Sequence, residues 1–359
     1  MDVPLLGDFE YRDWETEADG TIRFALVGMG WWTTDMVLPA IEACDRCTAT
    51  AVVSGTPEKR ERAVAEYDTV ETAMDYGEFE EGVDADAYDA VYVCTPNAVH
   101  LGSVEAAVER GQDVLVEKPM EATVERAREL AAVANEGDAT VMVAYRMHTE
   151  PSVRYARELV RAGVIGEPQF VQGQMSQTLL ELIEDPDQWR LDPDLSGYGT
   201  SVMDIGIYPL NTARYLLDAD PVSVQSMMRS SAPNFEDVED EVATFEVAFD
   251  DGTLAALAAS QNAQETSRLD VVGTEGRLAF DPAFHGVSEL RVTTGDATID
   301  VDLPQVDQME EEFAYFAAKV LADEPVHPDA DHGLTDLEAI AAIHAAAARG
   351  ERVDVGDAA

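Results

Sequence analysis

Short apolar runs alternate with helical segments between residues 21 and 146. The apolar runs read "TIRFALVGMG", "TATAVVSG", "DAVYVCTPN", "DVLVEKP" and "ATVMVAYR", and stretches such as "PEKRERAVAEY" and "HLGSVEAAVERG" separate them. β-Branched runs that alternate with helices are typical of a parallel sheet with crossover helices. The pattern predicts an α/β fold that begins with a doubly wound parallel sheet.

The pattern changes after about residue 147. Longer runs now alternate polar and apolar positions, with "DDG" and "GTEG" as turn signals: "QFVQGQMSQTL", "VATFEVAFDDGTLAALAASQ", "RLDVVGTEGRLAF" and "LRVTTGDATIDVDL". This rhythm predicts an α+β domain with a large, mostly antiparallel open sheet, and helices are expected again at residues 307–323 and 333–349. We expect an N-terminal arm (1–21), a first domain (22–147) and a second domain (148–359).

Charge narrows the choice of partners. The chain has 72 acidic against 23 basic residues, a net charge of −49, and yet 46% hydrophobic residues, so we expect a folded protein with a carboxylate-rich surface. At ~1 M salt the screening length is ~3 Å, which suppresses self-repulsion, so the composition indicates adaptation to high salt. No basic stripe is available for nucleic acid or anionic membrane, and a small-molecule ligand is favoured.

The N-terminal sequence, the length of the apolar runs and the cysteine content together predict a cytoplasmic protein. The N-terminus lacks a basic, apolar leader pattern, and no apolar run approaches ~18 residues. Three cysteines cannot form a disulfide framework. Cys44 and Cys47 have the spacing of a thiol pair, but a structural zinc site needs four ligands, so we expect core cysteines and no metal.

The first predicted strand ends in a glycine turn. Gly28 and Gly30 precede a helix whose N-terminal amides can hold a pyrophosphate. Thr33 replaces the third glycine of the dinucleotide fingerprint, and a bare G-x-G can also be only a tight turn. Its place at the start of a βαβ series favours dinucleotide binding.

The second strand leads into Ser54, Gly55 and Thr56, followed by Lys59 and Arg60. A site for NAD usually has an acid here for the ribose hydroxyls, whereas small residues and cations suit the 2′-phosphate of NADP. The alternative is a solvated helix face with i,i+4 ion pairs. We predict NADP in preference to NAD.

Two later strand ends lie at the same predicted edge of the sheet. One carries Thr95, Pro96, Asn97 and His100, which can also be read as a simple helix start. The other carries Lys118, one of three lysines in the chain. A surface lysine is the alternative, but the preceding apolar run and the scarcity of lysine favour a functional residue.

A helix is expected from about Ser201, with Asp204, Tyr208 and Asn211 at i, i+4 and i+7 on one face. The rest of this helix is apolar. The polar stripe therefore either faces a partly buried site or contains a buried tyrosine with a neighbouring partner.

Over residues 22–350 the chain resembles the glucose–fructose oxidoreductase, inositol dehydrogenase and rhizopine catabolism oxidoreductase family. The stretches that carry this resemblance are "VGMG", "CTPNAVH", "VEKPM" and "GYGTSVMDIGIYPLN". The resemblance implies a Rossmann nucleotide domain, then a substrate-binding domain whose sheet mediates a homodimer or homotetramer. It implies that Lys118, Asp204 and Tyr208 are catalytic and contact substrate with Tyr145 and Asn211. Further cofactor contacts are implied for Trp31, Trp32, Glu117, Arg146, Trp189 and Arg190.

The resemblance also implies a reaction, because members with inositol-type chemistry have histidine where this chain has Tyr208, and tyrosine indicates the sugar-oxidase and dihydrodiol dehydrogenase branches. NADP-dependent oxidation of an aldose, D-xylose first, at C1 to the lactone is expected. A phenol has an ordinary pKa near ~10, and an ammonium such as that of Lys118 favours its phenolate, which makes it a usable base. Alternatives are a trans-dihydrodiol dehydrogenase, an aldose–aldose oxidoreductase with tightly held NADP, and a nucleotide-sensing regulator.

Overall fold

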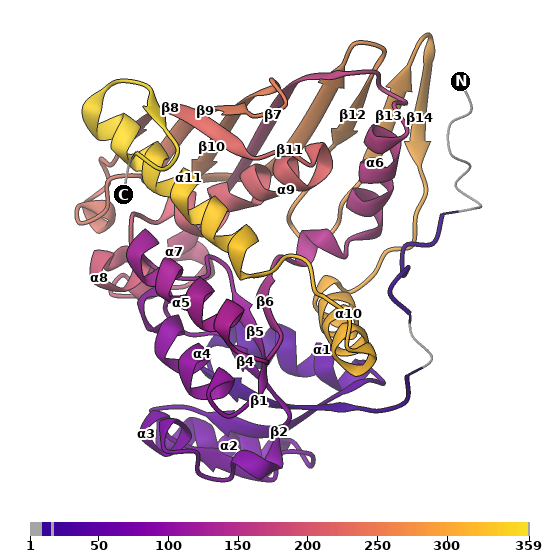
Figure 1. The fold of residues 1–359 in the computed structure, drawn as a ribbon. Helices are drawn as coiled ribbons and strands as arrows, with labels where there is room; N and C mark the ends of the chain where they lie inside the picture. Colours follow the sequence, from indigo (N-terminus) through magenta and orange to yellow (C-terminus); the bar gives the residue numbers. More distant parts are fainter. Residues whose placement is uncertain (1–8, 16–17, 358–359) are drawn as a thin grey trace. The chain divides into compact units, whose positions relative to one another are not determined.

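The computed structural model describes residues 9–15 and 18–357, which form two compact units (Figure 1). The parallel-sheet unit comprises Arg12–Arg146 and Asp307–Leu334. The open-sheet unit comprises Met147–Val306, the described residues from Thr335 onward and those up to Tyr11. The predicted fold class is confirmed by a parallel sheet in one unit and a mostly antiparallel sheet in the other.

In the described residues the parallel sheet has six strands in the order β3-β2-β1-β4-β5-β6. This is the Rossmann order, in which ligands bind beyond the carboxyl ends of the strands. The strand bounds are β1 Ile22–Val27, β2 Cys47–Val53, β3 Thr72–Met74, β4 Ala90–Val93, β5 Asp113–Glu117 and β6 Val141–Ala144. Nearly continuous apolar runs form the central strands because helices cover both faces.

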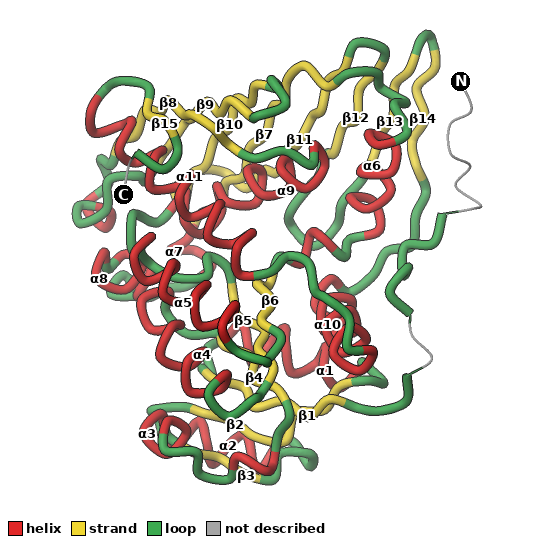
Figure 2. The backbone as a smooth tube through the Cα atoms, viewed as in Figure 1, coloured by secondary structure: helices red, strands yellow, loops and turns green. Residues whose placement is uncertain are grey.

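Helices connect these strands, as Figure 2 shows in red. They are α1 Leu38–Ala43, α2 Pro57–Glu66, α3 Tyr76–Glu80, α4 His100–Val108 and α5 Val124–Glu136. A π-helical turn, Thr33–Val37, precedes α1. Capping follows the expected chemistry: Asp75 and Glu78 form a capping box on α3, and Thr123 caps α5.

A helix from far along the chain completes the parallel-sheet unit. The sequence placed residues 307–334 in the second domain, but α10 (Gln308–Ala322) buries Phe313 and Phe316 against Phe24 of β1, with ring centroids 5.1 and 5.8 Å apart. Cys44 and Cys47 lie in this same core, and both thiols are buried. The apolar face of α10 is covered by the parallel sheet, and the burial of this face determines where the helix packs.

The described part of the predicted arm is divided between the two units, up to Tyr11 in one and from Arg12 in the other. Phe9 lies 5.0 Å from the ring of Tyr155 in the open-sheet unit. Trp14 packs edge-on against Tyr315 of α10, and Arg12 donates to the Glu311 carboxylate at 2.9 Å. Residues 1–8 and 16–17 of the arm lie outside the described residues.

The open-sheet unit contains nine strands within the described chain, in the order β14-β13-β12-β11-β7-β10-β9-β8-β15. All neighbouring pairs are antiparallel except β10 with β7. The strands are β7 Pro168–Thr178, β8 Pro221–Arg229, β9 Val242–Phe249, β10 Leu254–Ser260, β11 Asn262–Gly273, β12 Gly276–Phe280, β13 Leu290–Thr294, β14 Ala297–Val301 and β15 Val353–Asp354.

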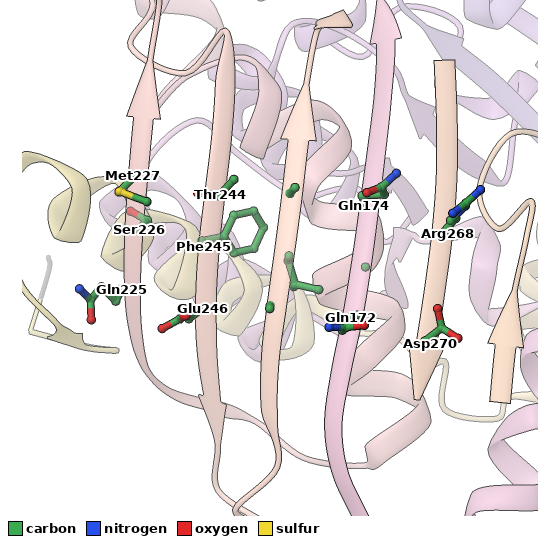
Figure 3. A pocket seen from close by; sticks show the side chains of 14 residues that line it. Gln172, Gln174, Gln225, Ser226, Met227, Thr244, Phe245, Glu246, Arg268 and Asp270 are labelled. Atoms are coloured by element: carbon green, nitrogen blue, oxygen red, sulfur yellow. The ribbon is translucent and has the colours of Figure 1, made fainter. Parts of the chain in front are cut away.

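Helices cover one face of this sheet. They are α6 Pro151–Arg161, α7 Leu179–Leu182, α8 Pro193–Ser196, α9 Ile207–Leu217 and the part of α11 (Ala330–Arg349) that belongs to this unit. A Cβ on Gly173 would lie 2.9 Å from Pro209 of α9, and Ser226 of β8 donates to the carbonyl of Ile343 in α11. The other face carries the polar half of the alternating pattern (Figure 3).

No helix of the described residues combines the length and apolarity that crossing a membrane requires. Within the same residues, no group of three or more histidine, cysteine, aspartate or glutamate side chains could hold a metal ion.

Candidate functional site

The glycine turn after β1 combines one obligatory glycine with one open position. Gly28 has φ +99°, and a Cβ there would lie 2.1 Å from the Cys94 carbonyl oxygen, so the turn excludes any side chain. At Gly30 a Cβ would meet nothing within 4 Å, which leaves room for a ligand to approach the backbone. Thr33, in place of the third glycine, donates its hydroxyl to the Gly28 carbonyl at 2.6 Å.

Basic residues of α2 fold back onto this turn. Lys59 Nζ donates to the Met29 carbonyl, between the two glycines, at 2.8 Å. Arg60 donates to the Ser54 carbonyl at the end of β2. Arg62 instead forms an exposed i,i+4 pair with Glu66, at 2.9 Å. The alternative of a solvated helix face with i,i+4 ion pairs therefore holds for Arg62. Lys59 and Arg60 instead lie at the edge of the sheet.

The loops after β4 and β5 are tied together by a buried histidine. The His100 ring approaches the carbonyls of Thr95 at 3.0 Å and Met120 at 3.3 Å, and burial lowers its pKa, which favours the neutral ring. Glu121, also buried, accepts hydrogen bonds from the Leu101 amide and from Arg126. These contacts hold the two loops in one conformation.

The residues around the glycine turn fit a dinucleotide. The Thr95 hydroxyl is buried and has no hydrogen-bond partner in the described part of the chain, and neither has the indole Nε1 of Trp32. Trp31 is partly exposed and packs edge-on against Trp32, with centroids 5.4 Å apart. Open space at Gly30, two cations and an unpaired hydroxyl at one strand edge are what a phosphate-bearing ligand requires.

Lys118 follows β5 directly. The carboxylate of Glu117 accepts a hydrogen bond from the Tyr92 hydroxyl at 2.6 Å and from the Lys118 amide at 3.2 Å. At the end of β6, Tyr145 is buried with its ring 5.9 Å from that of His332, and Arg146 donates to the Gln308 side chain. The parallel-sheet unit thus brings Glu117, Lys118 and Arg146 to one edge.

The open-sheet unit holds Asp204. One carboxylate oxygen, Oδ2, accepts from Arg190 Nε at 3.1 Å and from Gln261 Nε2 at 2.7 Å. The Arg190 guanidinium lies 4.4 Å from the centre of the Trp189 ring. Sequence reasoning assigned Trp189 and Arg190 to the cofactor and missed Gln261, which is fully buried between β10 and β11.

The helix predicted from Ser201 begins with a wider turn. Val202–Gly206 is π-helical, and α9 follows. Asp204 lies within this turn, which is wider than an α-helical turn, a feature that often marks functional sites. Tyr208 is half-buried, 6.0 Å from the Phe284 ring.

Asn211 lies deeper in the open-sheet unit. Its amide oxygen is 2.8 Å from His148 Nε2, and its amide nitrogen donates to Asp336 at 2.7 Å. Asp336 also accepts from Arg214. These contacts give Asn211 a structural role, and its contact with substrate stays a prediction.

Two buried acids fix the segment that carries Asp204. Asp240 accepts from the Thr200 and Val202 amides at 2.7 and 2.8 Å. Burial alone would raise the pKa of Glu241, but the amides of Ala232 and Ser231 and the Asn262 side chain lower it to about 2. The Ser201 hydroxyl donates to the Glu241 carbonyl. The start of the Asp204 segment is therefore held by the two residues that immediately precede β9.

Alanine at the two turn glycines should separate folding from cofactor binding. We expect Gly28→Ala to lower the melting temperature strongly, because strain of about 1–3 kcal/mol adds to the clash with Cys94. Gly30→Ala should keep the melting temperature and weaken NADP binding at least about tenfold, or ~1.4 kcal/mol. Gly102→Ala in α4, another open position, is the control for both measurements. Wild-type NADP affinity in Gly30→Ala would contradict the assignment.

Comparisons with known proteins agree with this arrangement. Residues 22–145 match the family described as "Oxidoreductase family, NAD-binding Rossmann fold", and residues 153–279 match the "GFO/IDH/MocA C-terminal domain". D-Xylose 1-dehydrogenase [NADP(+)] of Haloarcula marismortui is 50% identical, covering 95% of this chain and 96% of its own. D-Xylose 1-dehydrogenase (NADP(+)) 2 of Haloferax volcanii is 29% identical over 93% of this chain and its full length.

A solved relative extends the likeness to three dimensions. The structure of aldose-aldose oxidoreductase from Caulobacter crescentus, complexed with glycerol, is 32% identical with a TM-score of 0.87, covering 93% of this chain and 99% of the other. Levoglucosan dehydrogenase in complex with NADH and L-sorbose, at 20% identity and a TM-score of 0.83, shares the fold. Since both units match and half of all residues are shared with one relative across nearly its full length, the chain belongs to the GFO/IDH/MocA family of oxidoreductases.

Proposed function

We propose that this oxidoreductase oxidises an aldose, D-xylose first, at C1 with NADP⁺ and releases the lactone. The observation that carries the proposal is the 50% identity to an NADP-dependent D-xylose 1-dehydrogenase over nearly the whole chain, combined with lysine, aspartate and tyrosine at the expected positions. When bound, the oxidised nicotinamide supplies the hydride acceptor for the hydrogen on C1. The protein's own residues must then remove the hydroxyl proton.

In this proposal Tyr208 is the base. Its phenolate takes the proton of the C1 hydroxyl while the C1 hydrogen leaves with its electron pair, so that the C1–O bond becomes a carbonyl. The ammonium of Lys118 favours the phenolate electrostatically. Asp204, with Oδ2 bound by Arg190 and Gln261, orients a sugar hydroxyl or Lys118.

Turnover is the direct test. We expect D-xylose to drive NADP reduction, followed by nicotinamide absorbance, in ~2 M KCl, where charge repulsion is screened. Tyr208→Phe and Lys118→Ala should each lower kcat by about 10²- to 10⁴-fold, the usual loss for a missing acid–base group. Lys319→Arg, which keeps the cation near Glu324, and Tyr76→Phe are matched controls. A Tyr208→Phe enzyme with near-normal kcat would exclude the tyrosine as base.

We propose NADP as the preferred cofactor because Lys59 and Arg60 lie beside the glycine turn and no acid occupies the end of β2. Lys59→Ala should raise the KM for NADP at least about tenfold, with a much smaller effect on NAD, because only NADP carries the 2′-phosphate. Arg62→Ala, which removes only the exposed pair with Glu66, is the control. Equal losses for both cofactors in Lys59→Ala would contradict a 2′-phosphate contact.

An aldose–aldose oxidoreductase with tightly held NADP is the second candidate, favoured by the solved relative with a TM-score of 0.87. Such an enzyme would retain NADP through gel filtration and pass hydride from one sugar to another. A dehydrogenase would lose the cofactor on the column and require added NADP for turnover.

We also propose that the open face of the nine-stranded sheet binds a second copy of the chain. Two shallow cavities of about 580 and 360 Å³ lie on this face, the larger lined by Gln172, Thr244 and Glu246 among others (Figure 3). Met227 is 75% exposed and Leu254 58% exposed there. Apolar side chains set among polar ones are typical of such an interface.

The molar mass in solution tests this interface. We expect light scattering behind gel filtration to give a dimer or tetramer, and Met227→Glu together with Leu254→Glu to reduce the mass because carboxylates would be desolvated at the interface. Leu182→Glu in α7, at a side chain 56% exposed, is the control. An unchanged mass in the double variant would place the interface elsewhere.

A further inference from the structure

Glu312 is a buried acid whose carboxyl group has no hydrogen-bond partner in the described part of the chain. It lies in α10, is 1% exposed, and neither carboxyl oxygen has a hydrogen-bond partner within the described residues. An ionised carboxylate in such a place would be very costly, because it would lose its water and gain no donor. Neither the mechanism above nor the family match assigns it a role.

Two contacts of α10, and one between β4 and β5, locate Glu312 at the edge of the parallel sheet. Gln308, one turn earlier on the same face, binds Arg146 at the end of β6. Phe313, the next residue, packs against Tyr92 of β4 with centroids 5.2 Å apart. The Tyr92 hydroxyl in turn donates to Glu117 at 2.6 Å. The acid therefore lies beneath the strand ends that carry Glu117 and Lys118.

The groups that act electrostatically on Glu312 come from several elements. Burial raises its pKa well above the usual range, and the Glu117 charge raises it further, whereas Arg146 and Lys118 lower it by less. Tyr92 is fully buried, and burial raises its pKa as well. Cys47 of β2, also packed against α10, contacts the Phe313 carbonyl through its thiol.

Hydrogen bonding distinguishes the two acids. Glu117 accepts hydrogen bonds from the Tyr92 hydroxyl and from the Lys118 amide. Glu312 receives no donor from the described residues and is the acid that keeps a proton. Two carboxyl groups whose surroundings differ in this way adopt different protonation states.

We propose that Glu312 is a positioning residue that acts through Glu117 and Lys118: by remaining protonated, it keeps a single negative charge behind the ammonium of Lys118. This proposal rests on the role proposed for Lys118 in proton transfer. A second negative charge would hold the ammonium more tightly and oppose formation of the phenolate that the proposed mechanism requires. Ionisation of Glu312 therefore sets a limit on activity at alkaline pH.

Packing alone does not explain this residue. A glutamine has the same shape and would not lose a proton. The raised pKa means that the folded protein keeps a proton that the unfolded chain releases above pH ~4.3, so stability falls as pH rises from there toward the folded pKa. Glu312 thus lowers the free energy of unfolding at neutral pH. Such a cost is expected where a group has a functional role that depends on its bound proton.

The experiment compares wild type, Glu312→Gln and Glu310→Gln as full-length enzymes in ~2 M KCl. Glu310 is the control because it lies on the same helix and is partly exposed. Infrared difference spectra at neutral pH should show a protonated carboxyl C=O band in wild type and Glu310→Gln that is missing from Glu312→Gln. The alkaline limb of the kcat profile should move to higher pH by at least about half a unit in Glu312→Gln alone, a shift of ~0.7 kcal/mol.

Either negative result overturns the proposal. Absence of the infrared band in wild type would show that Glu312 is ionised. Superimposed pH profiles of wild type and Glu312→Gln would show that its charge does not act on the reaction. The infrared result does not depend on turnover, so a failure of the proposed sugar oxidation is distinguishable from a failure of this inference.

Discussion

Parallel strand pairing is the constraint on which the candidate site depends. Val27 of β1 pairs with Val93 of β4, and Val93 pairs with Val116 of β5, so these three strands end level with one another. The glycine turn, the Thr95 loop and Lys118 therefore leave the sheet at the same edge. The His100 ring lies beside backbone carbonyls of the loops after β4 and β5, and it thereby fixes the positions of these two loops relative to each other.

Buried carboxylates perform the same task in the open-sheet unit. Asp240 and Glu241 accept hydrogen bonds from backbone amides, and Glu241 also from the Asn262 side chain. In the parallel-sheet unit Glu121 accepts from a backbone amide and from the Arg126 guanidinium. In a chain with 72 acidic residues, most carboxylates face solvent. The buried structural carboxylates differ from the solvent-facing ones in the number of hydrogen bonds that they accept from the protein, because only hydrogen bonds offset the loss of water.

Local patterns predicted the strands, the glycine turn and the position of Lys118, since each depends on residues adjacent in sequence. Gln261 and Glu312 could not be found in this way. Gln261 stands between two other polar residues, Ser260 and Asn262, after an apolar run, and Glu312 is one of three consecutive glutamates in an acid-rich chain. Their burial depends on packing between distant segments, as does the return of α10 to the parallel sheet. The π-helical turn at Asp204 likewise depends on a hydrogen-bond ladder that apolar periodicity does not encode.

The scarcity of lysine becomes understandable from the contacts that arginine and lysine make. Arginine pairs with buried carboxylates, as Arg214 does with Asp336 at 2.7 Å, because its planar fork matches a carboxylate. Lys59 instead reaches one carbonyl inside a tight glycine turn, where a compact ammonium fits and a fork would have unsatisfied donors. A compact ammonium also suits Lys118, because the preceding carboxylate, that of Glu117, already accepts a hydrogen bond from Tyr92. In the proposed mechanism this ammonium acts as a point charge whose influence depends on distance, so the protonation of an acid such as Glu312 changes its effect.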